Sequence, residues 1–216
     1  MNAFRTLIIA ALGFTALPAF ALSDNGQAQL QQLQTRWAEI NYETPEKQRE
    51  AAFATLVTQA DAALASEPRA PELLIWRGII LSTQAGAKGG LGALGLVKQA
   101  KASLEQALAI DPKALAGSAY TSLGSLYYQV PGWPIGFGDD EQAEKMLKQA
   151  LAINPDGLDP NYFYGDFLQR QKRYEQARAA LEKALAAKDR PGRELADQGR
   201  RAEATALLQQ VTGKLQ

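Results

Sequence analysis

Three similar segments of 14 residues occur in this chain, and this repetition restricts the fold more than any other feature. QAKASLEQALAIDP at 99–112 matches QAEKMLKQALAINP at 142–155 almost residue for residue, and both resemble QARAALEKALAAKD at 176–189. Each copy places an alanine, a leucine four residues later and another alanine three residues after that. This spacing puts all three on one face of a helix, where small residues allow a second helix to approach closely. Pro112 and Pro155 end the first two copies as helices.

Each repeated segment follows another helical segment that carries a central glycine. These segments read LIWRGIIL at 74–81, YTSLGSLY at 120–127 and NYFYGDFL at 161–168. With its glycine-then-alanine order and closing prolines, the chain resembles the tetratricopeptide repeat family over residues 71–190. The resemblance implies an all-α fold, a right-handed superhelical solenoid of helix-turn-helix units with capping helices at both ends.

The segments on either side of the three predicted helix pairs complete this organisation. Residues 22–70 read as an N-terminal helical cap with a degenerate repeat, and residues 191–216 as an amphipathic C-terminal capping helix. Asp139 and Asp159 precede helical patterns and are predicted N-cap residues. The alternative is a helical bundle without repeats, in which the three similar segments have no common structural role.

Residues 1–21 have the pattern of a cleaved signal peptide. Arg5 supplies the positive charge, and the apolar run from Leu7 to Leu17 has the length of a signal core, too short to cross a bilayer. The small residues before position 22 predict cleavage after Ala21, and therefore export to the periplasm. The alternative is that this segment forms a buried N-terminal helix.

The composition excludes several classes of function. The formal net charge is +0, which gives no electrostatic reason to bind nucleic acid or anionic lipid. The chain contains no cysteine and no histidine, so it has no disulfide, no imidazole base and none of the usual zinc ligands.

No pattern in the sequence indicates a cofactor, a metal or a catalytic site. The glycines in GLGALG at 90–95 follow a predicted helix rather than the strand that dinucleotide binding requires. The acidic residues at 139–141 are explained by capping and the helix dipole. We therefore expect no cofactor, no metal site and no enzymatic activity.

The turns inside the first two pairs are longer than the turn inside the third, by about ten and about seven residues. The extra residues are expected to form loops at 85–95 and 130–140, and stacked units put equivalent turns at one edge of a solenoid. The second loop, VPGWPIGFGDD, combines rigid prolines with large apolar side chains, which are typical of interface anchors. Its predicted partner-binding residues are Trp133, Pro134, Ile135 and Phe137. The alternative is that the aromatic residues fold back and fill a gap over their own helices.

The family resemblance also implies that the first helix of each pair lines the concave face. The polar residues at these positions suit a peptide backbone or a hydrogen-bonding small ligand. An ordinary solvated helix face is the alternative. The predicted groove residues are Glu72, Ser82, Thr83, Thr121, Ser125, Tyr128, Gln129, Tyr162, Asp166, Gln169 and Arg170.

These features together predict an exported binding or scaffold protein. The segment PGWPIGFGDDEQAEKMLKQAL looks like the T-component proteins of tripartite ATP-independent periplasmic (TRAP) transporters, although no lipidated cysteine is present. That resemblance implies a solute-binding protein as partner and a homo-oligomer, whereas the lack of a lipidated cysteine departs from it and predicts no stable membrane insertion. The alternative is a chaperone-like adaptor for envelope proteins that binds extended peptide.

Overall fold

The computed structural model describes residues 22–216, so the predicted signal peptide lies outside the described residues. Within this range the chain is helical and forms no strand beyond one isolated bridge between Gly132 and Gly138. The elements are α1 (Asp24–Tyr42), α2 (Glu46–Ser66), α3 (Pro71–Lys88), the 3-10 helix η1 (Leu91–Ala93), α4 (Leu94–Ile110), α5 (Ala114–Gln129), α6 (Asp140–Ile153), α7 (Leu158–Arg170), α8 (Tyr174–Leu185) and α9 (Glu194–Gly213). None of these helices combines the length and the apolar character that spanning a membrane requires.

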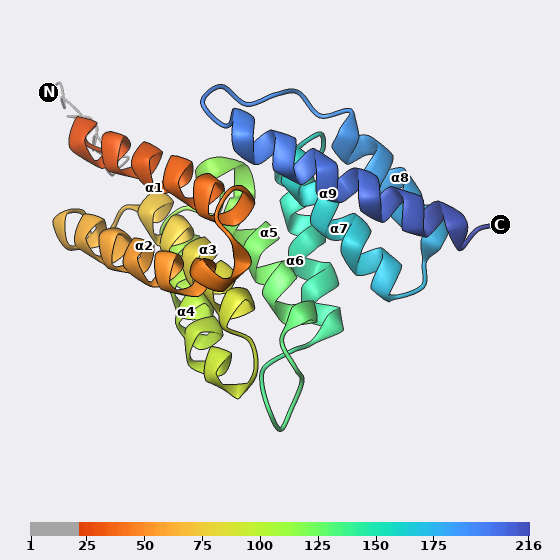
Figure 1. Ribbon diagram of the computed structural model, residues 1–216, viewed down its shortest axis with the longest axis horizontal. Coiled ribbons are helices and arrows are strands. Elements are labelled where there is room, and N and C mark those ends of the chain that lie inside the picture. The colour runs from red at the N-terminus through yellow and green to blue at the C-terminus, as the bar shows by residue number, and fades with distance from the viewer. Residues whose placement is uncertain (1–21) are drawn as a thin grey trace, which may run out of the picture.

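The three predicted pairs are present as α3 with α4, α5 with α6 and α7 with α8. Successive pairs stack along the molecule, and α1 and α2 cover the N-terminal end (Figure 1). The prediction of an all-α repeat solenoid is confirmed.

The central glycines hold the two helices of each pair together at short range. A Cβ atom added to Gly78, Gly124 or Gly165 would lie 2.6 to 2.7 Å from the Cγ of a buried leucine, which no real side chain tolerates. The facing leucines are Leu104, Leu147 and Leu181, the middle residues of the repeated segments. Close packing at these three positions is therefore what the repeated sequence encodes.

The first insertion differs from the predicted loop at 85–95. Ala85 to Lys88 continue α3, and α4 begins at Leu94, so the turn is confined to Gly89, Gly90 and the short helix η1. Both glycines have positive φ angles, which explains why α3 ends there. Most of the inserted residues lengthen the two helices instead of forming a loop.

The second insertion forms a narrow hairpin between α5 and α6. The backbone N–H of Asp139 donates to the Tyr127 carbonyl at 2.8 Å, and the N–H of Gly138 donates to the Pro131 carbonyl at 3.0 Å. Asp139 Oδ1 then accepts from the N–H groups of Glu141 and Gln142, so the predicted cap at this position is present. Figure 1 shows the hairpin and the α3–α4 turn at the same edge of the molecule.

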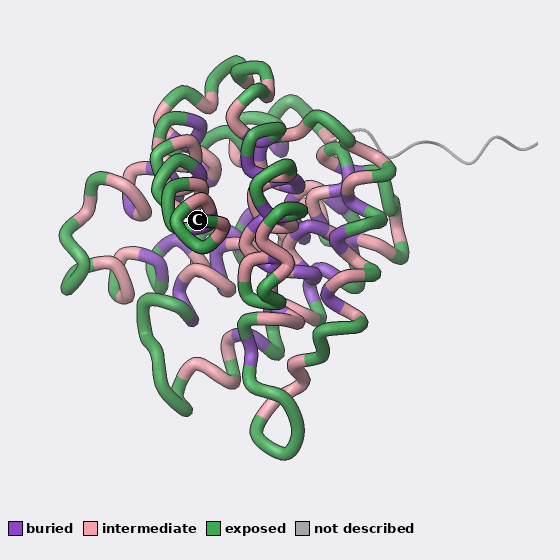
Figure 2. The backbone as a smooth tube through the Cα atoms, turned by 90° about the vertical axis from the view of Figure 1, so that its right-hand side faces the viewer, coloured by how far each residue is buried: buried purple, intermediate pink, exposed green. Residues whose placement is uncertain are grey.

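The C-terminal helix closes the fold onto its beginning. From the end of α8 the chain loops back toward α1, and α9 begins near the end of α1 and runs across α7 and along α8 (Figure 1). Ala196 of α9 belongs to the same buried cluster as Trp37 of α1 and Trp76 of α3, and Gly199 lies against the Tyr42 ring. Buried residues follow the inner faces of the helices, whereas the hairpin and the turns are exposed (Figure 2). The concave face is thus partly enclosed where α9 meets α1 and α3.

Candidate functional site

A cavity of about 310 Å³ lies between α1, α3, α5, α7 and α9, on the concave side of the helix pairs. Its apolar wall includes Trp37, Trp76, Phe163, Ile79 and Leu115. The rings of Trp37 and Trp76 meet edge to face at 5.8 Å. A cavity of this size with aromatic walls and a few polar groups has the character of a small-ligand site.

The polar wall of the cavity is rich in hydroxyl groups. Trp37 Nε1 donates to Thr83 Oγ1 at 2.9 Å, so that hydroxyl is already engaged. The hydroxyls of Ser118, Thr121 and Ser122 line the cavity and make no hydrogen bond with the rest of the described chain. They therefore remain able to donate to a ligand.

An unusual stretch of backbone brings these hydroxyls to the cavity. Leu115, Ala116 and Gly117 at the start of α5 all have φ between 46° and 78°, which is the left-handed region. This conformation costs roughly 1 kcal/mol or more for each residue that carries a side chain. The left-handed turn redirects the chain, so that Leu115 and Ser118 both face the cavity.

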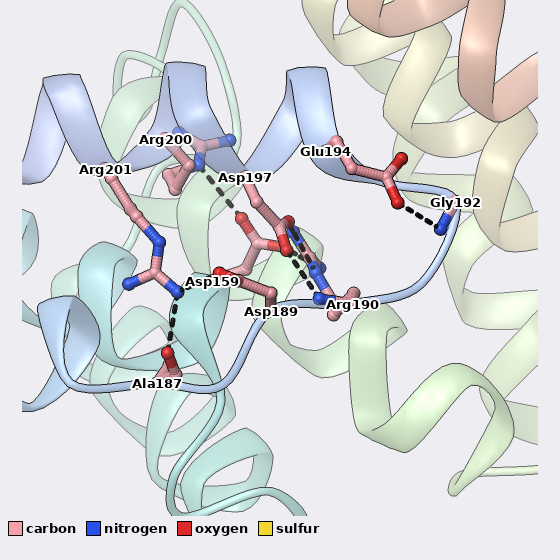
Figure 3. A network of polar contacts seen from close by, with 9 residues as sticks. All are labelled: Asp159, Ala187, Asp189, Arg190, Gly192, Glu194, Asp197, Arg200 and Arg201. Atoms are coloured by element: carbon pink, nitrogen blue, oxygen red, sulfur yellow. Dashed lines mark hydrogen bonds and ion pairs between the residues drawn. The ribbon is translucent and has the colours of Figure 1, made fainter.

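A network of ion pairs forms the C-terminal wall (Figure 3). Asp159 of α7 accepts from Arg190 Nη1 at 2.6 Å and from Arg200 Nε at 2.9 Å. Arg190 also pairs with Asp197, and Arg200 Nη1 donates to Glu203 at 2.6 Å. Both Asp159 oxygens are therefore occupied by arginine donors.

These ion pairs set the protonation of the groups involved. Burial favours the neutral acid, but the charges of Arg200 and Arg190 outweigh it and lower the pKa of Asp159. Burial works against Arg200 as well, yet the carboxylate of Asp159 raises the pKa of that guanidinium. The pKa of Tyr42, at the end of α1, is raised to about 12, mainly because the ring is buried. Asp159 and Arg200 are thus charged at neutral pH, and Tyr42 is neutral.

Arg193 is the exception among the three arginines that line the cavity. Its side chain makes no hydrogen bond or ion pair with any described residue, and its buried Nε has no partner. Its guanidinium lies over the Trp76 ring, 4.8 Å from the centroid. Burial, and then the positive charge of Arg190, lowers the pKa of Arg193. A guanidinium nevertheless stays protonated in proteins, so Arg193 adds a positive charge without a direct ion-pair partner, since the nearby carboxylates of Asp159 and Asp197 bond to other arginines.

A second candidate site is the tip of the α5–α6 hairpin. Trp133 is 90% exposed and Ile135 is 54% exposed. Phe137 is only partly buried and packs edge to face on Tyr127 at 5.7 Å, with Lys101 Nζ 5.8 Å from each ring. Phe137 therefore attaches the hairpin to its own helices, whereas Trp133 contacts solvent.

Comparisons with known proteins agree with this architecture. Tetratricopeptide repeat profiles match residues 91–114 and 135–193. The crystal structure of TTC0263, a thermophilic TPR protein of Thermus thermophilus, superposes with a TM-score of 0.57 and 26% identity, over 88% of this chain and 91% of that chain. This chain is a tetratricopeptide repeat protein.

Two further comparisons complete this picture. The crystal structure of MamA is 22% identical and covers 78% of this tetratricopeptide repeat protein and 92% of its own chain, with a TM-score of 0.45. No curated protein matches the sequence significantly.

Eight of the eleven predicted groove residues fall into two sets. Thr121 and Ser125 line the cavity of this tetratricopeptide repeat protein, together with Ser82 and Thr83. A second polar cluster lies beside it and consists of Tyr128, Gln129, Asp166 and Arg170, in which Tyr128 Oη donates to Asp166 at 2.8 Å and Arg170 lies 5.1 Å from the Tyr128 ring. Tyr162 lies beneath Arg200, 4.5 Å from the guanidinium, whereas Glu72 and Gln169 belong to neither set.

Several cavity residues were missed from the sequence. Trp37 comes from a helix outside the three pairs, and Arg190 is the last residue of the predicted repeat region. Arg193 and Arg200 come from residues 191–216, which were assigned only a capping role. The predicted N-cap at Asp159 is wrong, because α7 begins at Leu158 and the carboxylate binds arginines instead. The closely spaced arginines in DRPGRELADQGRR were the sequence signal that could have located this wall of the cavity.

Within residues 22–216, no group of acidic side chains is arranged to hold a metal ion.

Proposed function

We propose that this tetratricopeptide repeat protein is an exported scaffold that holds a protein partner through its hairpin tip. Tetratricopeptide repeat units indicate a protein-protein interaction scaffold. Location in the periplasm rests on the signal peptide pattern at 1–21, which lies outside the described residues. The partner-binding surface is assigned to Trp133, Pro134 and Ile135.

The exposure of Trp133 carries this proposal. A tryptophan that is 90% exposed gains nothing for folding, whereas burying it in a partner removes a large apolar area from water. The Pro131–Gly138 hydrogen bond and the Phe137–Tyr127 contact fix the hairpin before binding. Little conformational entropy is then lost when the tip docks.

For the partner, we propose a periplasmic solute-binding protein of a TRAP-type transport system, with a homo-oligomer as the working form. Support comes from the resemblance of the hairpin and α6 segment to T-component proteins. A binding surface at one edge also leaves the concave face free. Genes for a permease and a solute-binding protein beside the gene for this chain would agree with the proposal.

The test is affinity capture from periplasmic extract with identification by mass spectrometry. The Pro131 carbonyl and the Gly138 amide are 3.0 Å apart, so residues 132–137 can be replaced by Asn-Gly without moving α5 or α6. We expect the intact protein to capture a solute-binding protein, and the shortened protein and Trp133→Ala to lose it. Leu91→Ala is the control, since Leu91 is 77% exposed in the other turn at the same edge. Equal capture by intact and shortened proteins would exclude the hairpin as the binding surface.

A second candidate is an adaptor that binds the extended chain of an envelope protein. The polar cluster of Tyr128, Gln129, Asp166 and Arg170 favours it, because these groups suit a peptide backbone. The two candidates separate in the same capture experiment. An adaptor would retain outer-membrane proteins after the hairpin is shortened and lose them in Tyr128→Ala.

A further inference from the structure

The cavity beneath α9 offers more hydrogen-bond donors than acceptors. The unpaired Arg193 and three free hydroxyls face it, while both oxygens of Asp159, the acidic residue in its wall, are held by Arg190 and Arg200. The donor excess and a guanidinium without an ion-pair partner favour an anion over a cation or a neutral amide. Phosphate and carboxylate remain as the two common anionic groups.

The aromatic residues that line the rest of the cavity favour carboxylate over phosphate. Trp37, Trp76 and Phe163 line the same cavity with aromatic surface, and Trp76 already stacks on the guanidinium. A planar carboxylate pairs with a guanidinium through two parallel hydrogen bonds in the plane that this stacking leaves open. The aromatic walls would in turn bury an apolar body attached to the carboxylate.

The size of the cavity limits the ligand further. About 310 Å³ is the volume of about ten water molecules at about 30 Å³ each in the liquid. This space holds a small organic acid or the last residue of a peptide, but not a longer segment. We propose that the cavity binds the carboxylate of such a small apolar acid, with the Arg193 guanidinium as its anchor. Thr121, a buried residue with a free hydroxyl, is a secondary donor.

The cost of Arg193 to the fold provides a test that needs no ligand. A partly buried charge without a partner destabilises a protein, and it is retained where binding requires it. Arg193→Met keeps an apolar chain over Trp76 and removes the charge, so we expect the melting temperature to stay the same or rise. A fall of more than about 4 °C, equivalent to about 1 kcal/mol or more, would make Arg193 a structural residue and overturn the proposal.

Binding itself is measured by calorimetry and by tryptophan fluorescence in a Trp133→Phe background, where Trp37 and Trp76 are the reporters. The probes are 3-phenylpropanoate, its neutral amide, inorganic phosphate, and a tetrapeptide ending in phenylalanine with a free or an amidated C-terminus. We expect the carboxylate to bind about tenfold or more tightly than the amide, since charge-assisted hydrogen bonds are lost in the amide. Tighter binding of the peptide with a free C-terminus than of 3-phenylpropanoate identifies a protein C-terminus as the source of the carboxylate. Tighter binding of 3-phenylpropanoate identifies a free acid as the source.

Arg193→Gln should weaken carboxylate binding about tenfold or more, and Thr121→Val by a smaller factor. Arg178→Gln is the matched control, because Arg178 pairs with Glu175 on the exposed face of α8, away from the cavity. Binding that is unchanged in Arg193→Gln, equal for acid and amide, or tighter for phosphate would overturn the proposal. So would the absence of saturable binding by both carboxylate probes to a folded protein.

Discussion

The contacts inside the helix pairs and the junction between α9 and the rest of the molecule hold helices together in different ways. Inside each pair, a glycine of one helix meets a buried leucine of the other, and the contact is apolar. At the junction, α9 buries Ala196, Ala204 and Val211, and arginine–carboxylate pairs on Asp159 add a second kind of contact. The glycine–leucine contact occurs three times in the molecule, whereas the group of ion pairs on Asp159 occurs once.

This difference has a thermodynamic consequence. Close apolar packing gains free energy from every atom removed from water, and it needs no partner of opposite charge. A partly buried ion pair gains little net free energy, but losing one partner leaves a charge without compensation. The apolar contacts therefore supply net stability in both regions, whereas the ion pairs on Asp159 fix where α9 lies over the cavity.

Removing the acid at the junction has the largest expected effect. Asp159→Ala leaves Arg190 and Arg200 without their shared partner, and we expect a loss of about 3 kcal/mol in the free energy of unfolding. This is the lower end of the range for a broken buried pair, since the Asp159 side chain is 25% exposed. Urea denaturation followed by circular dichroism measures it. Glu175→Ala, which breaks an exposed pair with Arg178, should cost no more than about 1 kcal/mol; equal losses would show that the junction is an ordinary surface contact.

A single methyl group tests the contacts inside the pairs. In Gly124→Ala the new Cβ would lie 2.7 Å from Leu147 Cγ, and because Leu147 is fully buried, relieving this contact would shift packed atoms. We expect a loss of about 1–3 kcal/mol from overpacking, seen as a lower urea midpoint. Gly86→Ala in α3 is the control, because nothing lies within 4 Å of its Cβ position. There alanine should stabilise the helix by up to about 1 kcal/mol, and a loss at both positions would argue against a special glycine–leucine contact.

Acid should weaken the junction before it weakens the pairs. The pKa of Asp159 is lower in the folded protein than in the unfolded chain, so its contribution is fully present above the unfolded value of about 3.9. That stability is lost as the pH falls from about 4 through the folded pKa. We expect the melting temperature of Asp159→Asn to depend less on pH than that of the unmodified protein below about pH 4. Parallel curves would show that Asp159 does not contribute to acid unfolding.

The same comparison explains how much of this molecule could be predicted from its sequence. The glycine–leucine contacts are local and periodic, so three similar segments were enough to identify the pairs and the all-α solenoid. Asp159 and Arg200 meet across 41 residues of sequence, and nothing periodic links them. Asp159 was therefore interpreted as a local helix cap, which is the commonest role of an aspartate before a helical pattern. Thr121 and Ser125 were predicted to line the concave face, but the partner walls from α1 and α9 could not be placed without the closure of the fold.

The smallest expected effect on stability belongs to Trp133, which takes part in neither kind of contact. The side chain is 90% exposed at the end of a hairpin whose base is held by backbone hydrogen bonds and by Phe137. Trp133→Ala should therefore change the free energy of unfolding by no more than about 0.5 kcal/mol, as expected for an exposed position. Phe137→Ala should cost more, because it removes the aromatic contact with Tyr127. If Trp133→Ala instead lowers the urea midpoint as much as Gly124→Ala, the tryptophan belongs to the packing of the repeats and not to a surface kept for a partner.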